Sequence, residues 1–291
     1  MVSLEEEDLT NSHCANDSST NLVCCVGFRG TLPQYPLCGS SEPHRLVLNT
    51  YTDADDYPWT ALIQYENLRG ELELMCSGTL ITKRYIVTAA HCVSNLRGGI
   101  KVHRVRLGEW EINSNVDCNQ KQCAGPPVDM QIEKITKHRD YNRRNHLHDI
   151  ALVRFTSDVN FSDTVQPICL PTLDSVVGNK SLITGWLRDS AIGALDGKKM
   201  YHPVNINGFE ECSPIYEQKS VTLQSTQLCV DMGASWSKCK DHAEGTLMQG
   251  NGSAWFLAGV ASFGTIACSS DTPVVYTNIS AYVDWIRDNI Y

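Results

Sequence analysis

Short runs of β-branched and aromatic residues, separated by Gly, Pro and Asn, recur along the chain from about Arg45 onward. Runs of this length and composition are typical of β-strands, and no helical repeat lies between them. Many short strands in succession indicate an all-β barrel or sandwich. We expect strands at residues 59–65, 72–80, 85–87, 102–107, 149–155, 181–184 and 255–263.

Both ends of the chain depart from this pattern. Residues 1–44 are polar and contain scattered cysteines but little periodic apolar pattern, so we expect a boundary between Cys38 and Leu46. Near the other end, apolar residues recur at the spacing of one helical face, which predicts a C-terminal amphipathic helix. These residues are Ile279, Tyr282, Val283, Ile286 and Ile290.

Charge and hydropathy exclude two classes of partner. The 291 residues carry a formal net charge of -9, and no block of about five or six lysines or arginines offers the surface that nucleic acids or anionic membranes require. The longest apolar stretch, residues 254–268, is interrupted by Gly259, Ser262 and Gly264 and is shorter than the ~20 residues of a membrane-spanning helix. With 42% hydrophobic residues, the chain can instead bury a full core. We therefore expect a globular protein that binds no nucleic acid and does not span a membrane.

Thirteen cysteines are scattered over the chain without the paired Cys-x-x-Cys sets or the Cys/His alternation of a zinc site. They indicate disulfides formed in an oxidising compartment, and therefore secretion. The first residues, MVSLEEEDLT, lack the basic and apolar regions of a signal peptide, so either the natural start lies upstream or this is a processed or truncated form. Asn-x-Ser sequons agree with secretion and are candidate glycosylation sites. They are Asn16, Asn160, Asn179, Asn251 and Asn278.

Two short motifs, TAAHC at residues 88–92 and DIAL at residues 149–152, have the order and separation of the histidine and aspartate boxes of the chymotrypsin-like serine proteases. The chain resembles this family almost continuously over residues 46–291. This resemblance implies two six-stranded β-barrels with a C-terminal helix, with His91 as general base and Asp149 as the carboxylate that orients it. The supporting segments are PWTAL (58–62), CSGTLI (76–81), QPICLP (166–171), GW (185–186), SFG (262–264) and VYTNISAYVDWI (275–286).

The family's nucleophile segment, Cys-x-Gly-Asp-Ser-Gly-Gly-Pro-Leu, aligns without a gap with CKDHAEGTL at residues 239–247. Ala243 stands where the family has its serine nucleophile. Asp241 and Glu244 replace glycines of the oxyanion turn, and the Asp241 carboxylate has the wrong charge to lie near a developing anion. His242 replaces the aspartate that pairs with the new N-terminal amine of active relatives. Ser237 occupies the pocket floor, where trypsin-like members carry an acidic residue.

These departures predict a protein without peptidase activity. Loss of the triad serine removes about 10⁶ in rate, and loss of an oxyanion donor removes roughly 10² to 10³. His91 and Asp149 are then expected to persist as packed relics of the fold. Recruitment of another hydroxyl, such as Ser235 or Ser253, is disfavoured because neither occupies the turn that would face His91.

The resemblance also implies how most cysteines pair. Cys118 and Cys123 lie in an extra loop, DCNQKQCAGPP, and their closeness suggests a local bridge of the kind found in arthropod clip-domain proteases. Cys38 with Cys169 would tether the N-terminal segment to the protease-like domain. The pairs implied within that domain are Cys76 with Cys92, Cys212 with Cys229, and Cys239 with Cys268.

The remaining cysteines lie in CANDSSTNLVCC (14–25), which resembles the C-terminal half of a clip domain whose first half is absent. Truncation or degeneration of the module explains this. The expected organisation is a partial or degenerate clip segment at 1–37, a linker at 38–45, and a protease-like domain at 46–291.

The bond between Arg45 and Leu46 lies at the family's activation position. However, LVLN at residues 46–49 departs from the family's Ile-Val-Gly-Gly, and His242 gives the new amine no counter-charge. An activation-like switch would therefore require the new amine to pair with another acid such as Asp241. Otherwise cleavage would act simply by releasing a constraint on the chain.

Two further candidates are weaker. His138, His146 and His148 could bind a metal, but a solvated loop is the favoured interpretation. Glu109 lies where some relatives begin a calcium loop, yet it is the one clear ligand there, so a plain surface carboxylate is favoured. We expect no metal and no cofactor.

The resemblance to the arthropod clip-domain group implies a function in haemolymph. We expect a secreted, inactive homologue that acts as a cofactor or regulator of the protease cascades controlling melanisation and Toll-type signalling. Its expected partners are clip-domain proteases, other protease homologues or prophenoloxidase, held by loops such as 113–127 and 241–244. The alternatives are an active trypsin- or chymotrypsin-like endopeptidase and a protein that recognises microbial surfaces.

Overall fold

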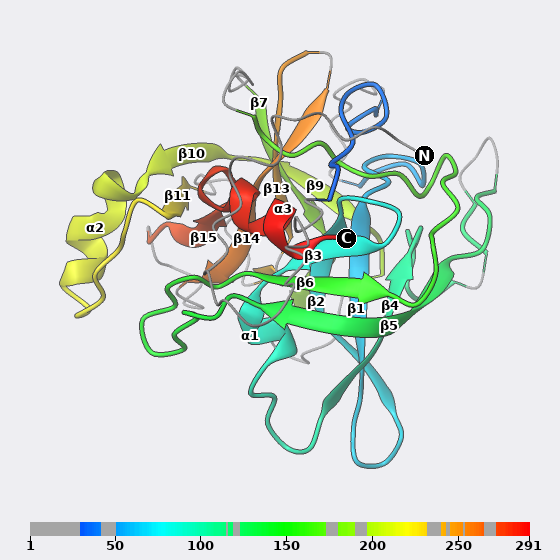
Figure 1. The fold of residues 1–291 in the computed structure, drawn as a ribbon, viewed down its shortest axis with the longest axis horizontal. Helices are drawn as coiled ribbons and strands as arrows, with labels where there is room; N and C mark the ends of the chain where they lie inside the picture. Colours follow the sequence, from blue (N-terminus) through cyan, green and yellow to red (C-terminus); the bar gives the residue numbers. More distant parts are fainter. Residues whose placement is uncertain are drawn as a thin grey trace, which may run out of the picture.

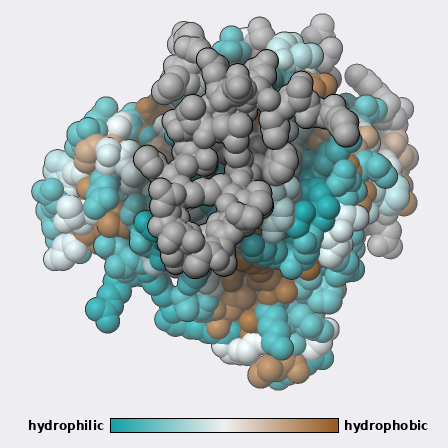
Figure 2. Space-filling view, viewed as in Figure 1, coloured by the Kyte–Doolittle hydropathy of each residue, from teal (hydrophilic) through white to brown (hydrophobic). Residues whose placement is uncertain are grey.

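The computed structural model describes residues 30–41, 51–114, 116–118, 123–172, 180–189, 197–231, 240–242, 245–252, 254–264 and 272–291. Its strands form two groups, one from each half of the chain, and the C-terminal helix lies where the two groups meet (Figure 1). On the face shown in Figure 2, most of the described residues around the grey region are hydrophilic (teal). This is expected if the apolar faces of the strands point inward.

The first group of strands closes into an antiparallel barrel in the order β1-β2-β3-β6-β5-β4. Its interior is apolar because alternate residues of each strand point inward; Ile63, Leu80 and Phe155 are fully buried. The strands are β1 (Thr60–Glu66), β2 (Leu72–Leu80), β3 (Tyr85–Thr88), β4 (Lys101–Leu107), β5 (Val128–Lys137) and β6 (Ala151–Phe155).

The second group is a seven-stranded antiparallel sheet in the order β10-β11-β15-β14-β13-β7-β9. A separate two-stranded sheet pairs β12 with β8. The strands are β7 (Lys180–Gly185), β8 (Leu187–Asp189), β9 (Met200–Pro203), β10 (Asn205–Gly208), β11 (Gln227–Asp231), β12 (Lys240–His242), β13 (Thr246–Gly250), β14 (Trp255–Phe263) and β15 (Val274–Asn278).

These two groups confirm the all-β, chymotrypsin-like fold class. The second group differs from the expected six-stranded barrel, since the described residues form an open seven-stranded sheet. A continuous apolar core joins the two groups and includes Trp59, Leu257 and Ile286. Thr79 and Thr246 form a hydroxyl–hydroxyl hydrogen bond of 2.8 Å across the junction, so the groups are packed against each other and not merely connected.

The helices are α1 (Ala90–Val93), α2 (Phe209–Glu217), η2 (Ile279–Tyr282) and α3 (Val283–Asn289). The last two confirm the expected C-terminal helix, which buries Ile279, Tyr282 and Ile286. The side chain of Asn278 accepts a hydrogen bond from the backbone N–H of Ser280 and so caps η2. No helix in the described part of the chain is long and apolar enough to cross a membrane.

Residues 30–41 pack directly against the second sheet. The backbone of Gly39 accepts a hydrogen bond from Trp255 and donates one to Pro167. Gly39 has φ of +66°, and a Cβ there would clash with the Trp255 carbonyl oxygen, so only glycine fits. The adjacent Cys38–Cys169 disulfide anchors the same segment. A cut at Arg45 would therefore leave this segment attached.

The structure forms four of the implied disulfides: Cys38–Cys169, Cys76–Cys92, Cys118–Cys123 and Cys212–Cys229. Cys239 and Cys268 lie outside the described residues, as do Cys14, Cys24 and Cys25. Each bridge limits the conformations of the unfolded chain, which stabilises the folded one.

Local environments predict which sequons carry glycan. Asn160 and Asn251 are exposed, whereas Asn278 is half-buried at the start of η2. A glycan must project into solvent from the folded protein. We expect Asn160 and Asn251 to be glycosylated on secretion from insect cells and Asn278 to remain unmodified. Enzymatic deglycosylation in isotope-labelled water followed by peptide mass spectrometry reads out each site; full occupancy of Asn278 would contradict the argument. Asn16 and Asn179 lie outside the described residues.

Candidate functional site

His91 and Asp149 meet at the junction of the two strand groups. His91 lies on α1, directly after β3, and Asp149 precedes β6, which pairs with β3. Because the sheet brings these two strand ends together, the His91 Nδ1 lies 2.8 Å from one Asp149 carboxylate oxygen, and the His91 backbone N–H donates to the other at 2.9 Å. The sequence prediction that these residues form a pair is consistent with this geometry.

Asp149 is fully buried and is held by donors from both strand groups. Ser262, on β14 of the second sheet, donates its hydroxyl to Asp149 Oδ2 at 2.7 Å. Thr277, on β15, donates to the Asp149 backbone oxygen at 2.9 Å. A buried carboxylate with several donors is held in one orientation, so the His91 ring is fixed as well. Ser262 belongs to the SFG motif, but nothing in that motif by itself predicts this role.

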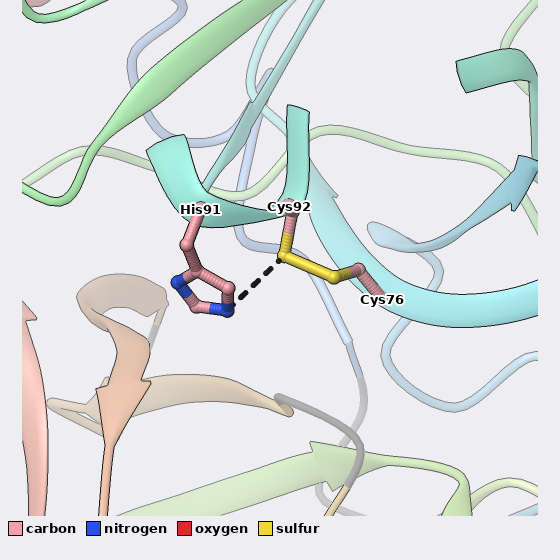
Figure 3. Close-up of side chains that lie close together, drawn as sticks. All are labelled: Cys76, His91 and Cys92. Carbon is pink, nitrogen blue, oxygen red and sulfur yellow. Dashed lines mark hydrogen bonds between the residues drawn. A yellow bond between two sulfur atoms is a disulfide. The ribbon is translucent and has the colours of Figure 1, made fainter. Parts of the chain in front are cut away.

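The other ring nitrogen of His91 faces the Cys76–Cys92 disulfide. The His91 Nε2 lies 3.6 Å from the Cys92 sulfur (Figure 3). His91, Cys76 and Cys92 have the residue types and proximity of a metal site. The two sulfurs are bonded to each other, however, and metal ligation requires free thiolates. This cluster is therefore a packed disulfide beside an oriented imidazole.

Most of the other predicted site residues lie outside the described part of the chain. Ala243, Glu244 and Ser237 lie outside the described residues, as does the Arg45–Leu46 bond. Asp241 and His242 lie in β12, and their backbones pair with Arg188 and Leu187 of β8. These assignments remain predictions from the sequence.

His138, His146 and His148 lie in a loop with several exposed neighbours, but their own side chains are not fully solvated. All three are half-buried, and they separate into two places. The His146 ring stacks on Phe263 at 4.6 Å, and burial lowers the pKa of His146. The His138 ring stacks on His148 at 4.7 Å, and burial likewise lowers the pKa of His138. Aromatic packing, which sequence spacing does not reveal, explains these positions.

His148 also has a polar partner at the C-terminal end of the chain. Its Nδ1 lies 2.9 Å from the Tyr282 hydroxyl. The Trp285 ring lies 5.3 Å from His138. The histidine pair therefore packs the segment before Asp149 against η2 and α3.

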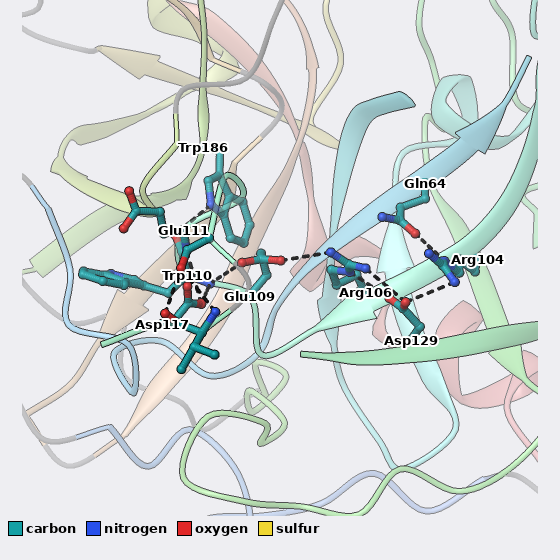
Figure 4. Close-up of polar contacts among 11 residues, drawn as sticks. Gln64, Arg104, Arg106, Glu109, Trp110, Glu111, Asp117, Asp129 and Trp186 are labelled. Atoms are coloured by element: carbon teal, nitrogen blue, oxygen red, sulfur yellow. Dashed lines mark hydrogen bonds and ion pairs between the residues drawn. The ribbon is translucent and has the colours of Figure 1, made fainter. Parts of the chain in front are cut away.

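The expected surface position of Glu109 is wrong. Glu109 is 1% exposed, and its carboxylate accepts from Arg106 Nη1 at 3.3 Å and from the Trp110 backbone N–H at 3.1 Å (Figure 4). Burial and the nearby carboxylate of Asp117 raise the pKa of Glu109. The segment LGEWE gave no sign of this burial, because the enclosure of Glu109 depends on tertiary packing.

These carboxylates do not fit a calcium ion as they are arranged. The Asp117 Oδ2 is taken by the backbone N–H groups of Trp110 and Glu111, at 2.9 and 3.3 Å. Of the four carboxylate oxygens of Glu109 and Asp117, the Asp117 Oδ1 is buried without a hydrogen-bond partner. Calcium requires about six to eight oxygen ligands, and here protein donors occupy the other carboxylate oxygens of Glu109 and Asp117.

Lys199 is buried in the same region. It is 1% exposed, and its backbone N–H donates to the Trp110 carbonyl at 2.7 Å. Burial lowers the pKa of Lys199 to about 8, an effect that Asp56, Asp55, Asp117 and Glu109 oppose. The ammonium charge is therefore costly in the folded state, although the acidic groups offset part of that cost.

Replacing Lys199 with Met is expected to raise the free energy of unfolding at pH 7 by about 3 kcal/mol, since one pKa unit corresponds to about 1.4 kcal/mol. The folded pKa lies below the ordinary value of 10.5, so the wild-type penalty is complete below pH 8 and fades as pH rises to about 10.5. Urea unfolding of both proteins across this range tests the difference. Lys198→Met is the control, because its exposed ammonium lies 3.6 Å from Glu111 and its loss should lower stability by less than about 1 kcal/mol. A constant difference across pH would contradict the prediction.

Comparison with known proteins identifies the family. The Trypsin family model matches residues 48–286. The chain is 40% identical to CLIP domain-containing serine protease B4 of Anopheles gambiae, over 97% of this chain and 82% of that protein. It is 34% identical to phenoloxidase-activating factor 3 of Holotrichia diomphalia, over 92% of this chain and 80% of that protein.

A solved structure agrees with these sequence matches. The Drosophila Grass clip serine protease of the Toll pathway superimposes with a TM-score of 0.74 at 31% identity, covering 86% of this chain and 73% of that one. Membership of one family explains the sequence motifs, the two groups of strands and the His91–Asp149 geometry. The chain therefore belongs to the trypsin family of serine proteases, within its arthropod clip-domain group.

Proposed function

We propose that this protein is a secreted, catalytically inactive protease homologue that acts by binding proteins, as a cofactor or regulator of an extracellular protease cascade in haemolymph. One observation carries the proposal: Ala243 occupies the nucleophile position of a chain that otherwise keeps the family's histidine and aspartate motifs. Similarity to proteins named as phenoloxidase-activating factors and as a Toll-pathway protease supports the cascade setting.

The chemistry of acyl transfer supports the absence of turnover. A general base accelerates the reaction by taking a proton from a nucleophile, and alanine offers none. Asp241 and Glu244 add carboxylates where a negatively charged oxygen would develop. Ser237 gives the pocket floor no charge to select Arg or Lys. The ordered His91–Asp149 pair then stabilises the junction of the two strand groups rather than catalysing a reaction.

Binding would use loops near this junction, including residues 113–127 and 241–244. Their partners would be clip-domain proteases, other protease homologues or prophenoloxidase. Cleavage after Arg45 would alter this surface while the Cys38–Cys169 bridge keeps the N-terminal segment attached. In this proposal the chain comprises a partial or degenerate clip-like segment (1–37), a linker (38–45) and the protease-like domain (46–291).

One experiment separates the main possibilities. Intact protein and protein cleaved after Arg45 are used to capture proteins from immune-challenged arthropod haemolymph, and captured proteins are identified by mass spectrometry. Peptidase turnover and labelling by a serine-directed fluorophosphonate are measured in the same samples. Capture of cascade proteins without turnover or labelling is expected. Saturable binding to bacterial or fungal polysaccharide, without protein capture, would instead support microbial-surface recognition.

An active endopeptidase is the second candidate, and the undistorted geometry of His91, Asp149 and Ser262 favours it. If this candidate is correct, the reagent labels the protein and His91→Ala abolishes turnover. Both results together would overturn the inactive assignment.

A further inference from the structure

The segment between β5 and β6 concentrates positive charge on an acidic protein. Residues 137–144, KHRDYNRR, contain four basic side chains and one acidic one, a net charge of +3 in a chain whose formal charge is -9. We call this segment the basic loop. All four of its basic residues are exposed: Lys137, Arg139, Arg143 and Arg144. A concentrated charge of opposite sign to the whole chain attracts partners that the rest of the surface repels.

Little of this positive charge is neutralised within the protein. Arg139 is 91% exposed at its side chain and makes one contact of 3.4 Å with Asp140, which is itself 58% exposed. Among the described residues, Lys137, Arg143 and Arg144 have no ion-pair partner. Ion pairs this exposed contribute little, so the guanidinium groups are available to an external carboxylate.

The backbone of the basic loop is fixed by hydrogen bonds. The Tyr141 N–H donates to the His138 carbonyl at 3.1 Å, and the Asn142 N–H donates to Leu147 at 3.0 Å. The Asn142 side chain then accepts from the Arg144 N–H at 2.9 Å. Beneath the turn, the His138 ring is stacked on His148. Arginines on a preformed turn lose less conformational entropy on binding than arginines on an unstructured one.

The basic loop lies beside the His91–Asp149 pair. In Figure 1 the green segment between β5 and β6 projects next to α1, which carries His91. Asp149, His91 and Arg143 all act electrostatically on His146, so His146 lies close to both the pair and the basic loop. Phe263 and His146, both half-buried and stacked, offer an apolar surface at the same place.

We propose that the basic loop docks an acidic segment of a protein partner beside the His91–Asp149 pair, with Arg139, Arg143 and Arg144 binding its carboxylates. This inference rests on the proposed function, because it names the chemistry of the partner. A polypeptide fits better than a polysaccharide because the charged turn adjoins the aromatic Phe263–His146 surface. Arginine and aromatic groups side by side are typical of protein–protein contacts.

The test compares two variants with the same loss of charge. R139Q/R143Q/R144Q removes the arginines of the basic loop, and R69Q/R97Q/K101Q removes exposed cations near the β1–β2 hairpin and the start of β4. Fluorescence anisotropy measures binding of a labelled short poly-L-glutamate at physiological ionic strength. We expect the loop variant to bind about tenfold more weakly and the control variant to change by less than about twofold. Thermal unfolding checks that both variants fold.

Equal weakening in both variants would overturn the proposal, because it would show attraction to total charge alone. Tighter binding to heparin or to phosphatidylserine vesicles than to poly-L-glutamate, lost in the loop variant, would assign the surface to a polysaccharide or a membrane and would also overturn it. A wrong docking surface can be distinguished from a failure of the proposed function. If the loop variant still captures the same haemolymph proteins as wild type, this surface is wrong but partner binding stands; if wild type captures none, partner binding itself fails.

Discussion

Replacing Ala243 with serine alone is expected to leave peptidase activity at or near background, whereas the variant D241G/H242D/A243S/E244G is expected to turn over substrate about 10³-fold faster than A243S. A serine at the family's nucleophile position would supply the missing nucleophile, but the carboxylates of Asp241 and Glu244 are predicted from the sequence alignment to oppose a developing oxyanion. Aspartate at position 242 also restores the counter-charge for a new N-terminal amine. Hydrolysis of peptides is measured after cleavage at Arg45, with Phe, Leu and Arg before the scissile bond.

The controls for this prediction use the oriented base. Adding His91→Ala to the fourfold variant should return turnover to background, because the histidine is the only proposed proton acceptor. Because the sequence alignment predicts Ser237 at the pocket floor, substrates with neutral residues before the scissile bond should be preferred over Arg substrates. Efficient turnover by A243S alone would show that the missing hydroxyl is the single defect and that the neighbouring substitutions are tolerated.

Replacing Asp149 with alanine is expected to lower the free energy of unfolding by about 3 kcal/mol. The fully buried carboxylate accepts from the His91 backbone N–H, the His91 ring and the Ser262 hydroxyl, and each buried donor left without a partner costs about 1–3 kcal/mol. Because these donors come from both strand groups, the substitution weakens their junction. Urea unfolding with disulfides intact measures the loss.

Two variants calibrate the Asp149 result. Ser262→Ala removes one of the three hydrogen bonds and should cost about 1 kcal/mol. Asp284→Ala removes a carboxylate that is 81% exposed and should change stability by less than about 0.5 kcal/mol. Equal effects of Asp149→Ala and Asp284→Ala would mean that the buried network contributes nothing measurable.

Strands with a strong local pattern were predictable and weakly patterned ones were not. Residues 72–80 and 255–263 form strands with the expected bounds. The strand expected to begin at Asp149 starts at Ala151, because the Ile150 N–H turns back to the His148 carbonyl. β5 was missed: VDMQIEKITK mixes charged and apolar residues, and closure of the barrel between β4 and β6 holds it in place. α2 was missed as well, with Pro214 inside it.

The amino-acid sequence by itself determined which reactive side chains are available, because an alanine lacks a nucleophilic hydroxyl whatever surrounds it. The sequence alone therefore identified His91, Asp149 and the alanine at position 243, and the motifs around them predicted the fold class. Burial was decided only by the tertiary structure. Glu109 was expected to be a surface carboxylate and is buried, and the structure also buries Lys199, which no sequence pattern singled out. The stacking of His138 on His148 and the orientation of Asp149 by Ser262 likewise depend on contacts that no local pattern records.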